Sequence, residues 1–85
     1  MGLLNRLCRP ENLIDEVMTM AHRIAANAPI AVGEAKQALN HALQADLKKG
    51  YEFELERYRR TVPTHDRLEG VAAFNEKRKP VFKGE

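Results

Sequence analysis

The sequence predicts an all-α protein with about four helices. Apolar residues recur at helical spacing in four separate stretches, and Pro, Gly or Asn residues interrupt the pattern between them. Alanine, the strongest helix former, supplies 11 of the 85 residues. Because alanine buries little area, we expect helices that pack closely and bury further surface against something else.

The first two helices are expected to form an antiparallel pair. The first should begin near Pro10, whose missing N–H is not needed in an opening turn, and end at Asn27–Pro29. The second should run from about Ile30 to Leu43. Both should turn an apolar stripe inward: Leu13, Val17, Met20, Ala21 and Ile24 in the first, and Val32, Ala35, Leu39, Ala42 and Leu43 in the second.

The third and fourth helices have candidate N-terminal caps. Asp46 can cap a helix from Leu47 to about Arg60, in which Gly50 predicts a close backbone contact. A fourth helix should run from 66 to about 77, with Asp66 and Glu69 as a capping box. We expect the third helix to extend away from the first pair and the fourth to fold back over the third.

The first residues predict a domain boundary. Leu3–Leu7 is a short apolar stretch that ends at Arg9–Pro10, a stop for any strand. Such a strand needs a partner, and none follows it in the chain. Residues 1–8 are therefore interpreted as a strand remnant at the end of a missing core, and residues 9–85 as a helical domain.

Composition argues against several classes of partner. Fourteen basic and twelve acidic residues give a net charge of +2, which is too balanced to predict nucleic-acid binding. No apolar run is long enough to span a membrane. A single cysteine, Cys8, excludes an internal disulfide. We expect a cytoplasmic protein or fragment.

No catalytic or metal-binding constellation is recognisable. The histidines His22, His41 and His65 lack metal-ligand spacing, and surface positions are expected for His22 and His41. Cys8 is interpreted as a partly buried, unreactive thiol. The carboxylates lie on charged faces or at helix starts, where solvation or capping explains them. We therefore predict no catalytic residue and no metal ligand.

The segment Phe74–Phe82 interleaves aromatic and charged residues. Phe74 and Lys77 are spaced i, i+3, so they should share a helix face. A ring beside an ammonium group can stack on a nucleobase while pairing with a phosphate, and Tyr58 can join them across the Val62–Pro63 turn. Residue chemistry alone also allows core aromatics and a solvated basic end.

Three parts of the chain carry a family resemblance. Residues 64–82 contain an Asp-x-x-Glu-Gly step, then Ala-Phe, Glu-Lys-Arg and a final Phe. Gly2–Leu7 is similar to a Gly-Leu-Val-Asn strand, and Pro10–Leu13, Ala25–Pro29 and Ala35–Lys36 match intervening helices in kind and spacing. The whole resembles the C-terminal segment of the enoyl-CoA hydratase/isomerase (crotonase) superfamily.

The resemblance implies a role in handling acyl-CoA thioesters without a catalytic centre of its own. In this family the oxyanion-binding N–H groups and the catalytic acids precede the C-terminal helices, so the 85-residue chain is expected to be inactive. The helices would support trimers or hexamers and cover the acyl-CoA pocket. Tyr58, Phe74 and Lys77 would contact the CoA adenine and its phosphate, with no separate cofactor.

An alternative is a stand-alone helical module for oligomerisation or protein interaction. Apolar surface that a small helical chain leaves uncovered would favour association. The reaction of a parent enzyme stays open, because hydration, isomerisation, dehalogenation and thioester hydrolysis share this scaffold.

Overall fold

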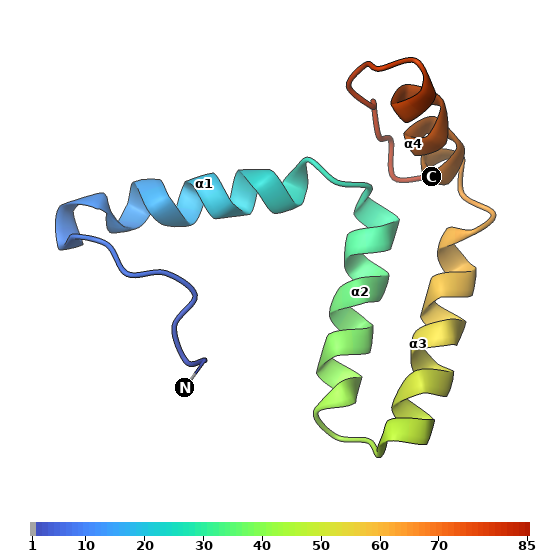
Figure 1. The fold of residues 1–85 in the computed structure, drawn as a ribbon, viewed down its shortest axis with the longest axis horizontal. Coiled ribbons are helices and arrows are strands. Elements are labelled where there is room, and N and C mark those ends of the chain that lie inside the picture. Colours follow the sequence, from blue (N-terminus) through green and yellow to red (C-terminus); the bar gives the residue numbers. More distant parts are fainter. Residues whose placement is uncertain (1) are drawn as a thin grey trace.

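The computed structural model describes residues 2–85 and contains four α-helices and one 3-10 turn among them (Figure 1). In chain order these elements are η1 (Pro10–Asn12), α1 (Leu13–Ala25), α2 (Pro29–Ala42), α3 (Leu47–Thr61) and α4 (His65–Asn75). The predicted all-α class and the number of helices are confirmed.

The segment before η1 forms neither helix nor strand in the described residues. No other strand is present among residues 2–85 to pair with Leu3–Leu7, so the strand remnant, which would pair within a missing core, stays a prediction. Arg6 ties the segment to α1 by donating to the Glu16 carboxylate at 2.7 Å. Met1 lies outside the described residues, and the domain boundary after residue 8 stays a prediction.

Local chemistry explains where the helices begin. The Asp46 carboxylate accepts the Lys49 N–H at 2.8 Å, so the predicted cap of α3 is confirmed. The predicted capping box of α4 is wrong, because the helix begins at His65 and the Thr64 hydroxyl accepts the Arg67 N–H at 3.2 Å. The Asp66 carboxylate is then free to bind elsewhere.

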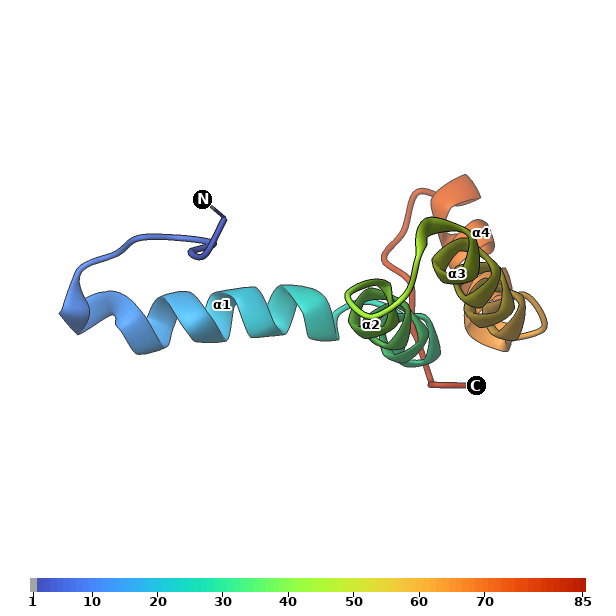
Figure 2. The same ribbon diagram turned by 90° about the horizontal axis from the view of Figure 1, so that it is seen from below.

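The antiparallel pair is α2 with α3, and α1 runs away from it (Figures 1 and 2). The predicted pairing of the first two helices is therefore wrong. Ala28 is extended (φ −60°, ψ 121°) because Pro29 follows it, and this connection carries the chain away from α1. The short turn at 43–46 instead reverses the chain and lays α3 beside α2.

Polar and aromatic contacts join α2 to α3. Arg57 donates to Gln37 at 2.6 Å and to Glu34 at 3.4 Å. The His41 ring stacks on Phe53 with centroids 3.9 Å apart. The predicted surface position of His41 is therefore wrong, since the ring is half-buried in the helix pair. The contact predicted at Gly50 is also wrong, because a Cβ there would meet nothing within 4 Å.

The described residues enclose almost no core. Only Ala73 and Asp66 are buried, and no large side chain is fully enclosed. The radius of gyration is 16.0 Å, against about 12 Å for a compact domain of this length. The two apolar stripes predicted to face inward are largely exposed, including Ile24 at 55% and Leu39 at 70%. That prediction is wrong because the main helix packing within residues 2–85 is that of α2 on α3, and there Leu39 borders an open groove.

This openness gives a direct stability prediction. We expect Leu39→Ala to lower the free energy of unfolding by less than about 0.5 kcal/mol, as surface substitutions do. A buried leucine would instead cost about 2–5 kcal/mol. Urea unfolding measures the difference, with the half-buried, stacked Phe53→Ala as the costlier comparison. A loss above about 2 kcal/mol would show that Leu39 is covered in solution.

Within residues 2–85, no helix is both long and apolar enough to cross a membrane.

Candidate functional site

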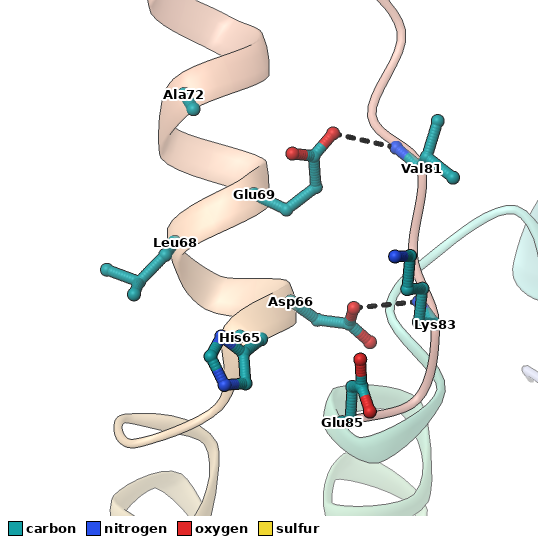
Figure 3. Close-up of a pocket in the computed structure, with 8 residues that line it drawn as sticks. All are labelled: His65, Asp66, Leu68, Glu69, Ala72, Val81, Lys83 and Glu85. Atoms are coloured by element: carbon teal, nitrogen blue, oxygen red, sulfur yellow. Dashed lines mark hydrogen bonds between the residues drawn. The ribbon is translucent and has the colours of Figure 1, made fainter.

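The tail, residues 76–85, returns along α4 and is held by a buried acid of that helix (Figure 3). The Asp66 side chain is only 3% exposed. Its two oxygens accept the Lys83 and Gly84 N–H groups at 2.8 Å each, and its own N–H donates to the Glu85 carbonyl at 2.9 Å. Gly84 supplies the positive φ of +76° that this turn of backbone requires.

A second acid holds the tail one helical turn later. The Glu69 carboxylate accepts the Val81 N–H at 2.9 Å (Figure 3). The Arg78 guanidinium donates through both terminal nitrogens to the two Glu69 oxygens, the second bond measuring 3.1 Å. Asp66, Glu69 and Arg78 together are called the tail clasp below.

The Arg78 guanidinium lowers the pKa of Glu69 from 4.5 to about 2, and the Val81 N–H adds to the effect. The two carboxylates of Glu69 and Glu76 raise the pKa of Arg78 above its usual value. Both shifts favour the charged pair. The clasp is therefore an ionic structure at neutral pH.

The lowered pKa predicts acid sensitivity. A carboxyl whose folded pKa lies below its unfolded value adds stability above pH 4.5, and that stability is lost as the pH falls toward 2. We expect the melting temperature to drop between pH 5 and pH 2, and Glu69→Gln to flatten part of this drop. Thermal unfolding followed by circular dichroism measures both. An identical pH profile for Glu69→Gln and the unchanged chain would contradict a role for Glu69 in acid stability.

A hollow of about 380 Å³ lies between α4 and the tail (Figure 3). Its lining mixes acidic, basic and apolar side chains: His65, Asp66, Leu68, Glu69, Ala72, Val81, Lys83 and Glu85. No group of three potential metal ligands occurs among residues 2–85. Because the two inner carboxylates already bind tail amides, the hollow is explained by the docking of the tail.

The C-terminal end of α4 brings two predicted site residues together. Lys77 N–H donates to the Phe74 carbonyl at 3.2 Å, and Arg78 N–H donates to the Ala73 carbonyl at 3.0 Å. These two bonds form a Schellman motif, in which the residue after the cap is left-handed. Lys77 takes that position with φ of +55°. Phe74 is 84% exposed beside it.

This geometry corrects one sequence-based detail. The helix ends at Asn75, so Lys77 lies beyond it and does not share a regular helix face with Phe74. Glycine is the usual residue at the left-handed position that ends a helix. Because a lysine takes this position, the sequence did not indicate that the helix ends before Lys77. Lys77 makes no ion pair within the described residues.

The third predicted site residue lies on another helix. Tyr58 is 62% exposed and lines a groove of about 550 Å³ between α2 and α3. In the part of the chain that the structure describes, no stacking joins Tyr58 to Phe74. A backbone hydrogen bond therefore links Lys77 to Phe74, whereas Tyr58 lies on another helix. Cys8 is half-buried, as predicted.

Sequence reasoning missed the tail clasp. The sequence predicts a capping box of Asp66 and Glu69 and no role for Arg78. Their i, i+3 spacing does place both carboxylates on one side of α4. An extended tail after Pro80 has free N–H groups that need acceptors. This need, together with the two carboxylates on one side of α4, is the sequence signal from which the tail clasp could have been predicted.

Solved structures define the class of protein. A crystal structure of an enoyl-CoA hydratase from Bacillus anthracis matches 99% of this chain with a TM-score of 0.94 and 42% identity. The curated mitochondrial enoyl-CoA hydratase of Pongo abelii is 39% identical over 82 residues, or 96% of this chain. A Bacillus subtilis protein, YngF, provisionally described as an enoyl-CoA hydratase/isomerase, is 45% identical over 98% of the chain. The arrangement of helices is therefore one found within crotonase-type enzymes.

The family profile described as enoyl-CoA hydratase/isomerase matches residues 1–85. This chain belongs to the enoyl-CoA hydratase/isomerase family. It spans about a third of the relatives' length, covering 32% of the Bacillus subtilis protein, 28% of the Pongo abelii enzyme and 33% of the Bacillus anthracis chain.

Proposed function

We propose that this chain is the C-terminal helical segment of an enoyl-CoA hydratase-like enzyme acting on acyl-CoA thioesters. Its role is to support subunit association and to cover the acyl-CoA pocket. The observation that carries the proposal is that the exposed Phe74 ring and Lys77, which makes no ion pair within residues 2–85, lie three residues apart at the C-terminal end of α4. Family membership supplies the substrate class.

The end of α4 suits the nucleotide part of coenzyme A. An exposed aromatic ring can stack on adenine, and an ammonium group that has no internal partner can pair with a phosphate. Phe74 and Lys77 offer these two groups on adjacent backbone. Tyr58 is proposed to add a second aromatic contact from α3, in the assembled enzyme.

The exposed apolar faces suit subunit association. Ile14 is 70% exposed on α1, and Leu43 and Leu47 are 87% and 92% exposed at the α2–α3 turn. Faces of this kind commonly mark protein interfaces. We propose that they pack within a trimer or hexamer of the parent enzyme. The half-buried free thiol of Cys8 is compatible with a reducing compartment such as the cytoplasm.

Catalysis is not assigned to this segment. Stabilising an enolate needs preorganised donors at the thioester oxygen and a carboxyl in a dry pocket. In residues 2–85 the one buried carboxylate, Asp66, is occupied by tail amides. We therefore expect the 85-residue chain to show no hydratase activity.

A coenzyme A titration followed by NMR chemical shifts tests the nucleotide contact. We expect shifts at Phe74 and Lys77, and an affinity about tenfold weaker in Lys77→Ala, because a charge-assisted contact to phosphate is lost. Lys79→Ala is the matched control, since it removes the same charge two residues away. Equal weakening in both variants, or no shift at Phe74, would contradict a specific contact.

A stand-alone association module is the second candidate function, and the near absence of a core favours it. It predicts self-association without coenzyme A affinity. Sedimentation velocity over a range of concentrations distinguishes the two, because a monomer at all concentrations contradicts the module.

A further inference from the structure

Lys77 occupies a backbone conformation that lysine disfavours. Its φ of +55° lies in the left-handed region, where a Cβ is crowded and glycine is the usual residue. Non-glycine residues persist there only when surrounding contacts hold them. The contacts that hold Lys77 therefore bear on where its ammonium group and the neighbouring Phe74 ring can lie.

Glu69 supplies contacts on the C-terminal side of Lys77. It binds the guanidinium of Arg78, the next residue, through both oxygens, and it also accepts the Val81 N–H at 2.9 Å. Glu69 lies in the middle of α4, and its side chain is mostly covered, at 24% exposed. The Glu69 side chain thus attaches both ends of the segment 78–81, which follows Lys77, to α4.

All three guanidinium nitrogens of Arg78 donate hydrogen bonds within the tail clasp or beside it. Its Nε donates to Glu76 at 2.6 Å, and its terminal nitrogens donate to Glu69 and to the Lys79 carbonyl. Two carboxylates offset its single charge. Arg78 therefore has few free donors for a phosphate, although it lies between the basic residues Lys77 and Lys79.

We propose that Glu69 is a positioning residue for nucleotide binding: through Arg78 and Val81 it holds Lys77 in the left-handed conformation that presents Lys77 and Phe74 together. This inference rests on the proposed coenzyme A contact. Glu69 would then favour the binding of an anion by positioning Lys77, although its own negative charge repels that anion.

The two possible roles of Glu69, as a charge or as a positioning residue, predict opposite changes in coenzyme A affinity for Glu69→Gln. If Glu69 acts only as a charge, Glu69→Gln frees Arg78, makes the site more positive and tightens coenzyme A binding. If Glu69 positions Lys77, the same variant weakens binding by about tenfold, because the site must be ordered on binding. Glu76→Gln is the matched control: it removes the same charge beside Arg78 but leaves both Glu69 contacts, so it should not weaken binding.

A second measurement reads Lys77 directly and needs no ligand. A positive φ gives a strong intraresidue NOE between the amide proton and Hα, and we expect Glu69→Gln to weaken this NOE at Lys77 while Glu76→Gln keeps it. Circular dichroism checks that helix content is unchanged. The proposal is overturned if Glu69→Gln binds coenzyme A as tightly as the unchanged chain or retains the strong NOE.

The two proposals fail in different ways. If the unchanged chain does not bind coenzyme A, the nucleotide contact fails, and the NOE alone then decides whether Glu69 holds Lys77. If the chain binds, Lys77→Ala weakens binding and Glu69→Gln tightens it, the contact stands and the positioning role is overturned.

Discussion

Asp66→Ala is expected to release the tail from α4 and to lower the free energy of unfolding by about 2–4 kcal/mol. The carboxylate accepts two backbone N–H groups at 2.8 Å and is 3% exposed. Hydrogen bonds to a charged group contribute about 1.5–3 kcal/mol each, and some of this is recovered when the freed amides bind water. Asp66 also lies in the first turn of α4, where the helix dipole favours a negative charge.

Two measurements check the effect of Asp66→Ala. Urea unfolding gives the loss of stability, and hydrogen exchange at the Lys83 and Gly84 amides shows whether the tail is released. Asp46→Ala is a suitable control, because its exposed carboxylate accepts a single N–H as the cap of α3 and should cost about 1 kcal/mol. If Asp66→Ala costs no more than Asp46→Ala, the buried contact does not anchor the tail.

The helices could be predicted because their signals are local. Periodic apolar residues, the break at Asn27–Pro29 and the Asp46 cap each act within a few residues, and the structure confirms the helices they predict. Family resemblance also rested on a local motif, residues 64–82, and the family is confirmed.

The packing of the helices could not be predicted in the same way. An apolar stripe shows that a helix face is to be covered but not what covers it. The sequence predicts that α1 pairs with α2 and that both stripes face inward, whereas the structure leaves Ile24 and Leu39 exposed and pairs α2 with α3. The deciding feature was the extended Ala28 before Pro29, which directs α2 away from α1.

The role of Phe74 and Lys77 stays a prediction. The Lys77 N–H donates to the Phe74 carbonyl at 3.2 Å, but α4 ends at Asn75, so the predicted shared helix face is not formed. The helix end between them was missed because a lysine, and not a glycine, takes the left-handed position. Asp66 and Glu69 have the spacing of a capping box, and only the tertiary path of the tail shows that they bind Lys83 and Val81.

The double variant Gly33→Ala/Gly50→Ala is expected to stabilise this chain by about 1–2 kcal/mol. Both glycines lie inside helices, Gly33 in α2 and Gly50 in α3. A Cβ at either position would meet nothing within 4 Å. Alanine therefore adds helix propensity and reduces the freedom of the unfolded chain without a steric cost.

The matched control is the same substitution at Gly84, where φ of +76° makes alanine unfavourable by about 1 kcal/mol. Urea unfolding of both variants should give shifts of opposite sign. Destabilisation by Gly33→Ala/Gly50→Ala would show that these helix faces are covered in solution. Because a subunit or domain interface can require a residue without a side chain, that result would indicate an interface at Gly33 or Gly50, while stabilisation would indicate that neither glycine lies in one.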